Sequence, residues 1–484
     1  MSKTMPVATK KSKAPRKVPE SSAMVGALKC FGAALRERCS DGANFAAIEE
    51  EALSLANELT RRALQSELEA IVGALGTGDL LIDGVLHRHH HGGRKDYSCM
   101  VGTLDVERPT YRPVGVRNGK TVVPLEFSAG LIEGMTPAFA ARVARGNGEC
   151  TDRELHAQLT ASRRVPPSRA KLERLCKRMG TALKDNVRTI ESVARSADTL
   201  PAGTARVVIG LDRTTVPMEE ARPADAPPKP PRVAPYVRKP PEPIEVHYRM
   251  AYIGTVVFYN DQGTALRSFR YAASMEDGPN EVLHSMMLDV RRAMQQAPTL
   301  HVLVIQDAAK EMWTLVIAAL EKEPSVQTWD VLVDHYHAME HLQKAAAIID
   351  EPTDALMARW KTRLRESDDA IDEIEQRVLF EITQGYRPPL REELEKEAVY
   401  LANNKHRLRF AALRDAGCPI GSGPTEAACK SVVAQRAKRS GQRWLNHGLA
   451  AALASRTQLL NDRLPAAVVT LRERVYTRDV QLAA

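Results

Sequence analysis

Three acidic residues in the second half of the chain have the setting of metal-binding carboxylates. Asp212 and Asp307 each end a short, almost continuous apolar run, which is typical of a strand buried on both faces. Glu426 follows Gly-Ser-Gly-Pro-Thr, which predicts a place in the first turn of a helix, where the dipole favours a carboxylate. Close carboxylates repel one another unless a cation lies between them. The acids therefore indicate chemistry assisted by two divalent ions, and all-carboxylate ligation favours Mg2+, or Mn2+ in its place.

The elements that must position these acids follow a recognisable order from residue 204 onwards. The pattern predicts strand, strand, strand, helix, strand, helix and strand, with ranges near 206–212, 248–259, 265–273, 280–295, 301–307, 310–322 and 331–334. This is the order of an RNase H-like α/β core, in which the first and fourth strands are neighbours. We therefore expect Asp212 and Asp307 to lie side by side at the ends of their strands.

A charged helical stretch interrupts this core. Residues 338–416 have helical periodicity with a break at 385–389, and the last helices open at Gly421. Between Ala427 and Arg443 there are five cations and no acid: Lys430, Arg436, Lys438, Arg439 and Arg443. We expect them on the helix that begins near Glu426, as a positive strip suited to a phosphate backbone. The alternative is that they pair with acids of the insertion, such as Glu392, Glu393 and Glu395.

The first 200 residues contain helical segments around a small β region. Residues 23–76 read as amphipathic helices, and 81–128 as a small antiparallel sheet. Short helices from Thr136, Thr151 and Pro167 form a unit at about 136–190 that looks like a helix-turn-helix. Its last helix carries Arg169, Lys171 and Arg174, so we favour DNA contact over a plain three-helix bundle with a solvated basic face.

Two further segments have two interpretations each, and a third has one. The basic tail at 1–20 is either solvated or an arm that contacts phosphates. The run His87–His91 could bind zinc with Cys99, but the spacing matches no familiar ligand pairing, so a polar loop near a nucleic-acid backbone is favoured. The proline-rich segment 223–243 is a stiff excursion from the core.

The composition limits the class of protein. The 484 residues carry a formal net charge of +8, which is compatible with a polyanionic partner. Seven scattered cysteines without a Cys-x-x-Cys pair argue against a disulfide framework. There is no apolar run of membrane-spanning length and no apolar stretch behind the basic N-terminus. We therefore expect a cytoplasmic protein with no membrane association.

Several motifs together resemble a known family, the DDE transposases of the ISKra-four insertion-sequence family within the Mutator-like group. The motifs are Gly210-Leu211-Asp212, Gln306-Asp307-Ala308, the segment from Asp334 to Leu342, the segment from Ile420 to Glu426 and the segment from Arg436 to Trp444. The resemblance covers residues 200–484 well and 95–200 loosely, and its late motifs are the specific ones. The proline-rich loop after Asp212 has no counterpart in the family.

The resemblance implies an α+β multidomain enzyme with an RNase H-like catalytic core. Its catalytic triad would be Asp212, Asp307 and Glu426, and its Asp-x-x-His signature falls on Asp334 and His337. The implied reaction is metal-dependent cleavage and strand transfer of an insertion sequence. The implied partner is double-stranded DNA, both the terminal inverted repeats and the target, bound by a homo-oligomer. A nuclease or resolvase without strand transfer, and a non-catalytic DNA-binding regulator, are the alternatives.

Two histidines near the third acid have an open role. His337 and His341 are four residues apart, so on a helix they share a face. They could ligate a metal with Asp334, but packing that supports the active site is favoured. The expected domains are a disordered tail 1–20, an N-terminal region 21–200, core 201–345, helical insertion 346–416 and C-terminal helices 417–484.

Overall fold

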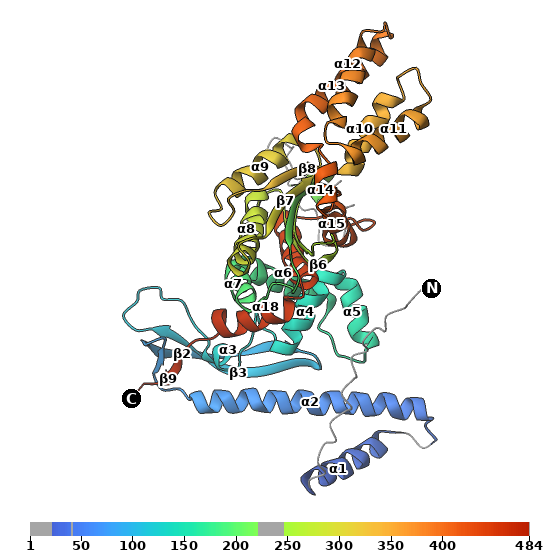
Figure 1. The fold of residues 1–484 in the computed structure, drawn as a ribbon. Helices are drawn as coiled ribbons and strands as arrows, with labels where there is room; N and C mark the ends of the chain where they lie inside the picture. Colours follow the sequence, from blue (N-terminus) through green and yellow to red (C-terminus); the bar gives the residue numbers. More distant parts are fainter. Residues whose placement is uncertain (1–21, 40–41, 221–245, 484) are drawn as a thin grey trace, which may run out of the picture.

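The computed structural model describes residues 22–39, 42–220 and 246–483 as a mixed α+β chain with two sheets (Figure 1). The expected basic tail at 1–20 and the proline-rich segment 223–243 lie outside the described residues. No helix in the described ranges combines the length and the apolar character needed to cross a membrane.

A five-stranded sheet forms the centre of the molecule, with the order β6-β5-β4-β7-β8. Its strands are β4 (Arg206–Glu219), β5 (Val246–Tyr259), β6 (Ala265–Ala273), β7 (His301–Gln306) and β8 (Asp330–Val333). β4 pairs with β5 antiparallel and with β7 parallel, so the expected neighbours are adjacent. One prediction is wrong: β4 does not end at Asp212. It continues to Glu219 because β5 pairs with it along its whole length.

Helices cover both faces of this sheet. Successive strand residues point to opposite faces, and β5 illustrates this. A side chain at Gly254 would collide with Met286 of α8 (Pro279–Gln296), whereas Thr255 contacts Thr425 of α15 (Gly423–Ala428). α8 therefore packs on one face and α15 on the other. The buried core that contains α8 also includes α9 (Lys310–Glu321), which follows β7.

The expected helical insertion follows β8. It consists of α10 (His335–Ala346), α11 (Thr353–Glu366), α12 (Ala370–Ile382), α13 (Pro388–Asn404), the short η1 (Lys405–Arg407) and α14 (Ala411–Asp415). In Figure 1 these orange helices extend away from the central sheet, at the end opposite α2. Their apolar faces share the core of the central sheet, so the insertion is packed on the sheet at its base.

The second sheet has the order β3-β2-β1-β9 and joins the two ends of the chain. Its strands are β1 (Leu80–Ile82), β2 (Val85–Cys99), β3 (Gly102–Pro113) and β9 (Val480–Leu482). The helices α1 (Ser22–Arg38), α2 (Phe45–Leu75) and α3 (Pro124–Ser128) accompany it, and α2 runs along the sheet in Figure 1. β9 pairs antiparallel with β1, so the C-terminal segment returns to the N-terminal region.

The histidine run lies in this sheet and not in a loop, which corrects the sequence interpretation. His87–His91 is part of β2, with a bulge opposite β3 between His89 and His91. His87 is buried, and the ring of His91 is hydrogen-bonded to Thr110 at 2.5 Å. The side chains thus have structural partners within the sheet.

The three expected helices of the 136–190 unit are present as α4 (Pro137–Glu149), α5 (Asp152–Ala161) and α6 (Arg169–Asp185), followed by α7 (Val187–Ala197). Thr151 caps α5 in a reciprocal capping box with Glu154. The third helix begins at Arg169, because Ser168 caps it, two residues later than Pro167.

This unit is not separate from the end of the chain, which departs from the expected domain boundaries. Apolar residues of α4 to α7 share one buried core with α18 (Leu464–Thr470) and the π-helical η3 (Leu471–Val475). α17 (Asn446–Leu460) packs so closely on α6 that a side chain at Gly180 would meet the main chain of Ala451. Residues 136–197 and the C-terminal helices therefore form one packed body.

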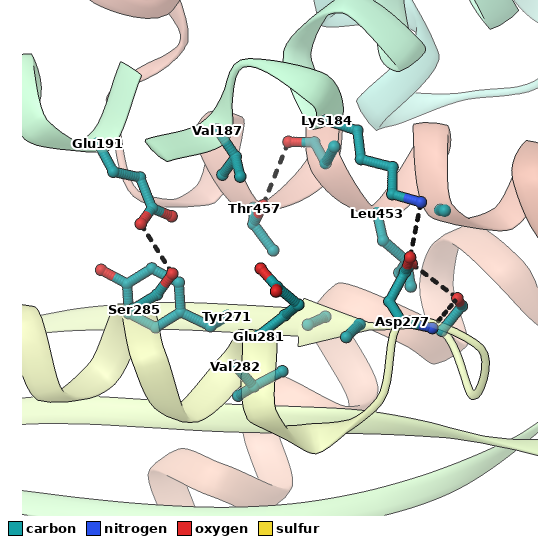
Figure 2. A pocket seen from close by; sticks show the side chains of 15 residues that line it. Lys184, Val187, Glu191, Tyr271, Asp277, Glu281, Val282, Ser285, Leu453 and Thr457 are labelled. Carbon is teal, nitrogen blue, oxygen red and sulfur yellow. Dashed lines mark hydrogen bonds and ion pairs between the residues drawn. The ribbon is translucent and has the colours of Figure 1, made fainter. Parts of the chain in front are cut away.

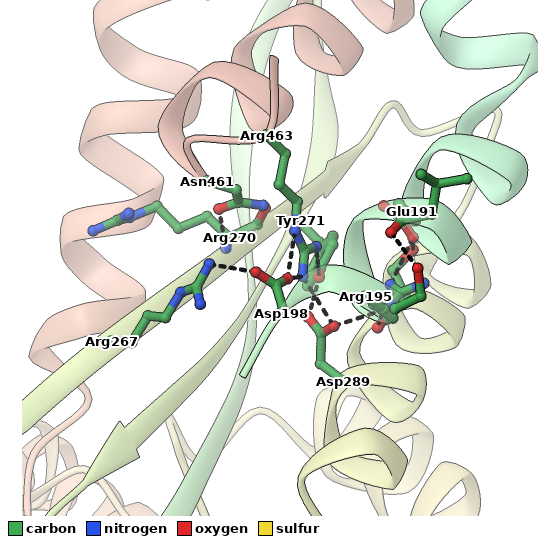
Figure 3. A network of polar contacts seen from close by, with 12 residues as sticks. Glu191, Arg195, Asp198, Arg267, Arg270, Tyr271, Asp289, Asn461 and Arg463 are labelled. Carbon is green, nitrogen blue, oxygen red and sulfur yellow. Dashed lines mark hydrogen bonds and ion pairs between the residues drawn. The ribbon is translucent and has the colours of Figure 1, made fainter. Parts of the chain in front are cut away.

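A buried polar network also links this body to the central sheet (Figure 3). Arg195 of α7 binds Asp289 of α8 at 2.7 Å, and Arg463, before α18, binds Asp198 at 2.7 Å and the hydroxyl of Tyr271 at 2.9 Å. Burial raises the pKa of Tyr271, so its hydroxyl stays protonated. Charges removed from water this fully must keep their partners, because an unpaired buried charge is costly.

A cavity of about 320 Å3 lies at the same junction (Figure 2). Lys184 of α6 binds Asp277 at 2.6 Å, and the hydroxyl of Ser285 donates to Glu191 at 2.7 Å. Because these polar groups pair across the cavity from α6, α7 and α8, they hold the helical unit on the sheet.

Candidate active site

Strand register places the first two acids next to each other. β4 and β7 are parallel, with Arg206 opposite His301 and Ile209 opposite Val304. Three residues further in the same register, Asp212 comes opposite Asp307, which directly follows the end of β7. The side chain of Gln306 accepts a hydrogen bond from the main-chain N–H of Leu211 at 3.3 Å, which fixes this register beyond the last pair. Asp212 thus lies within β4, three residues beyond the last pair with β7.

The third acid is held against the same strands by its neighbour in α15. The hydroxyls of Thr425 and Thr255 are hydrogen-bonded at 2.7 Å, which fixes α15 on β5. Gly210 lets α15 approach β4, because a methyl group there would lie 2.5 Å from Oγ1 of Thr425 and 2.7 Å from the carbonyl oxygen of Ile305. Glu426 follows Thr425 and is exposed. Its carboxylate is therefore carried by a tightly placed helix while remaining open to solvent.

Asp334 connects the end of β8 with the start of α15. One carboxylate oxygen caps α10 by accepting from the main-chain N–H of His337 at 2.9 Å, and the other accepts from the main-chain N–H of Ser422. The carbonyl oxygen of Ile420 in turn accepts from the N–H of His335 at 3.1 Å. Asp334 is only 1% exposed, so its role is to position the chain around Glu426.

The pKa of Asp307 responds to burial and to the charges of the other acids. Burial is the main cause that raises its pKa above the usual 3.8, and the charges of Asp212, Asp334 and Glu426 raise it further. His337 opposes this effect. The other three acids therefore disfavour the charged form of Asp307.

Asp212 has neighbours that the sequence did not single out. Its Oδ2 accepts from the thiol of Cys429 at 3.1 Å, and its Oδ1 accepts from the main-chain N–H of Arg213 at 2.6 Å. Burial and then the charge of Asp212 raise the pKa of Cys429, so the thiol remains a donor. The guanidinium of Arg213 forms an ion pair with Glu311 of α9 at 2.6 Å. These contacts orient Asp212 without neutralising it by an ion pair of its own.

The two histidines pack with the insertion. Nδ1 of His341 donates to the buried carboxylate of Glu397 at 2.7 Å, and its ring stacks on Tyr400 with centroids 3.6 Å apart. The ring of His337 lies 4.9 Å from that of His341 and acts on Asp307 electrostatically. α13 thus contacts the site through Glu397 and Tyr400. Sequence reasoning missed these two residues because no motif distinguishes them from the other residues of an acidic helix.

The donor set fits a hard divalent cation. Carboxylate oxygens are the ligands such ions prefer, and the raised pKa of Asp307 records the repulsion that a cation would relieve. Across the described ranges, no group of three or more His, Cys, Asp or Glu side chains is placed so that it could hold a metal ion. This applies to Asp212, Asp307 and Glu426 and to His87–His91 with Cys99, so the acids supply the right type of ligand without being assembled as a metal site.

The expected helix of cations after Glu426 is broken, which changes the interpretation of its residues. After α15 the chain forms the π-helical η2 (Cys429–Ala434) and the short α16 (Gln435–Ala437), and Lys438, Arg439 and Arg443 follow outside the helix. The segment then turns back, and Trp444 pairs with the end of β4 near Met218. Such irregular helices are frequent at functional sites.

Two of the five cations bind residues of the N-terminal helices α4 and α5. Arg436 is 3% exposed, donates to the carbonyl oxygen of Asn147 at 2.8 Å and lies over the ring of Trp444. Arg439 binds Glu154 of α5 at 2.6 Å. The expectation that Arg436 faces DNA is therefore wrong for this arrangement. Arg439 connects its segment to helix α5.

The alternative partners named from sequence are also wrong. Glu393 and Glu395 pair within α13, with Lys396 and Arg391 respectively. Lys430, Lys438 and Arg443 are exposed, with Lys430 near Glu426 at 3.7 Å and Lys438 bonded to Thr214. Lys430 and Lys438 therefore form a positive surface beside the acids, whereas Arg443 precedes Trp444 at the Glu219 end of β4.

The basic helix α6 keeps its cations on the surface. Arg169 and Arg174 are exposed and Lys171 is half-buried. Within the described part of the chain, none of the three forms an ion pair, whereas Lys177 binds Glu173 and Arg178 binds Glu133. The start of α6 is therefore the part of this helix with unpaired positive charge.

Comparison with known proteins adds no family to these observations. No protein-family model matches the chain, and no curated protein has a significantly similar sequence.

Proposed function

We propose that the protein is a DDE-type transposase with an RNase H-like core, which cleaves and joins DNA of an insertion sequence. The proposal is supported by the sheet order β6-β5-β4-β7-β8, whose register brings Asp212 beside Asp307, and by the charge of Glu426, which acts on Asp307. The long helical insertion between the second and third acids supports the same assignment.

Asp212, Asp307 and Glu426 would hold two divalent ions, Mg2+ or Mn2+. When bound, such ions activate a water or a 3′-hydroxyl and stabilise the oxygen that leaves phosphorus. Cys429 and the N–H of Arg213 keep Asp212 oriented, and Asp334 keeps the segment that carries Glu426 in place. These contacts supply the pre-organisation that such a site needs.

Double-stranded DNA is the proposed partner. Lys430 and Lys438 lie beside the acids and would contact phosphates near the scissile bond. Arg443 is exposed at the Glu219 end of β4 and would contact the duplex farther from that bond. Arg169, Lys171 and Arg174 at the start of α6 would contact a second stretch of the same duplex. Both surfaces belong to one packed body, so DNA binding and chemistry are mechanically connected.

A strand-transfer assay tests this proposal. Pre-cut DNA ends from the sequences that flank the gene are incubated with the full chain, Mg2+ and a supercoiled target plasmid. The proposal predicts covalent joining of the 3′ ends to the plasmid. Cleavage of uncut DNA without any joining would assign a nuclease or resolvase to the same acids, and the Asp307→Asn protein serves as the inactive control.

A further inference from the structure

A groove of about 730 Å3 begins next to Asp307 and runs between α9 and α13. Ala308, which follows Asp307, lines its inner end. The wall from α9 includes Lys310 and Trp313, and the opposite wall includes Tyr400 of α13 and Arg407 of η1. Asp307 itself does not line the groove, but it is the residue before Ala308, and its charge contributes to the raised pKa of Tyr400 after burial and Glu397.

Two hydrogen-bond donors in the walls have no acceptor. Trp313 is 1% exposed and its Nε1–H has no partner among the described residues. The buried hydroxyl of Tyr400 likewise has none within the described ranges. A buried donor left unsatisfied costs about 1–3 kcal/mol, so two in one groove indicate a missing acceptor.

The charge of the groove matches an anionic acceptor. Its lining contains the cations Lys310, Lys396 and Arg407 against one carboxylate, Glu321. Lys396 is paired with Glu393, but no carboxylate of the described chain pairs with Lys310 or Arg407. Arg407 instead lies over the ring of Trp313 at 4.3 Å, and burial lowers the pKa of its guanidinium.

The N-terminus of α9 is a third feature of the groove that favours an anion. α9 begins at Lys310, and its N-cap residue, Ala309, supplies no side-chain cap. The N–H groups of the first turn and the helix dipole therefore favour an anion at this end. Oxygen-rich anions such as phosphate satisfy N–H, hydroxyl and guanidinium donors together.

We propose that this groove binds the sugar-phosphate chain of a single DNA strand, next to the bond on which Asp212, Asp307 and Glu426 act. This inference rests on the proposed function, which supplies DNA as the polyanion. A volume of about 730 Å3 is that of a small-ligand pocket. It accepts a nucleotide or two of an unpaired strand and excludes a duplex.

Binding of a labelled single strand of about 12 nucleotides, followed over a salt series, tests the proposal. Lys310→Gln and Arg407→Gln should each reduce the slope of log affinity against log salt by about 0.7, since each removes one phosphate contact to a single strand. The matched control is Lys322→Gln, an exposed cation at the other end of α9 that is not in the groove. It should bind like the wild type.

Tyr400→Phe keeps the aromatic ring on His341 and removes the hydroxyl alone. It should weaken single-strand binding severalfold without lowering the melting temperature, because the hydroxyl has no partner in the described chain to lose and its removal relieves an unsatisfied donor. Melting curves of Lys310→Gln and Arg407→Gln separate lost binding from lost folding.

Wild-type slopes in both Lys310→Gln and Arg407→Gln would overturn the groove proposal. Equal loss of slope with a blunt duplex of the same length would overturn its restriction to single strands. The two proposals fail separately. If the wild type never cleaves DNA but Lys310→Gln still loses single-strand affinity, the groove stands without the transposase; if the wild type cleaves and the variants bind normally, the transposase stands without the groove.

Discussion

Asp334 accepts a hydrogen bond from the main-chain N–H of Ser422, although the two residues are 88 positions apart in the chain. The same carboxylate caps α10 through the N–H of His337 at 2.9 Å. The helical insertion lies between these two residues, so the carboxylate of Asp334 links the two ends of the insertion. It also fixes the loop from which α15 carries Glu426.

Asp334→Ala should therefore damage both stability and cleavage. Loss of an N-cap costs about 0.5–2 kcal/mol, and the freed N–H of Ser422 adds to this. We expect a lower melting temperature, and cleavage that falls even at a temperature where the variant is folded, because Glu426 is no longer held. Asp334→Asn retains one acceptor and should be intermediate; an Asp334→Ala protein with wild-type cleavage would rule out this positioning role.

Gly210→Ala tests the close approach of α15 to the sheet. The added methyl group would lie 2.5 Å from Oγ1 of Thr425, so α15 must move. Overpacking of this kind costs about 1–3 kcal/mol. We expect reduced stability and a cleavage rate at least tenfold lower. Gly93→Ala, at a strand glycine with open space around it, is the control and should melt and cleave like the wild type.

Arg436→Ala and Arg443→Ala should have opposite signatures. Arg436 is buried on Trp444 and Asn147, so its loss should cost about 2 kcal/mol of stability and leave the salt dependence of duplex binding unchanged. Arg443 is exposed, so its loss should reduce the duplex salt slope by about 0.9 with little effect on melting. Melting curves beside salt-series binding decide between these roles, and a flattened slope in Arg436→Ala would contradict its assignment as a structural residue.

The raised pKa of Asp307 predicts a stability effect that needs no DNA. The folded chain holds a proton on Asp307 at pH values where the unfolded chain, with a pKa near 3.8, has lost it. Stability should thus fall as the pH rises from about that value through the folded pKa. In metal-free buffer at neutral pH, Asp307→Asn should melt a few degrees higher than the wild type. Added Mg2+ should raise the melting temperature of the wild type but not that of the variant. A lower melting temperature for Asp307→Asn in metal-free buffer would argue against crowded, repelling carboxylates.

Sequence patterns predicted the central elements well because their signals are local. The apolar runs before Asp212 and Asp307 are β4 and β7, and the glycine-rich turn before Glu426 does open a helix. The length of β4 was missed, because its second half is stabilised by pairing with β5 and not by its own apolar pattern. The three short helices of residues 136–190 were also readable, since Thr151 caps the second of them.

The roles of the cations could not be read from sequence. Arg436 and Arg443 are of the same type in the same segment, yet one is buried and the other exposed, because the chain turns back at Lys438 and pairs Trp444 with β4. Cys429 and Tyr400 were missed for a similar reason: a single thiol and a single phenol acquire a role only when distant elements bring Asp212 or Asp307 beside them.

The central claim is that three carboxylates form one metal-dependent site for cutting DNA. The most direct test measures Mg2+-dependent cleavage of a plasmid that carries the flanking DNA, with the wild type and with Asp212→Asn, Asp307→Asn and Glu426→Gln at equal DNA occupancy. We expect the wild type to cleave the plasmid and EDTA to abolish this cleavage. In each variant the cleavage rate should fall at least a thousandfold while duplex binding is retained. Wild-type cleavage by any one variant, or cleavage that persists in EDTA, would contradict the central claim.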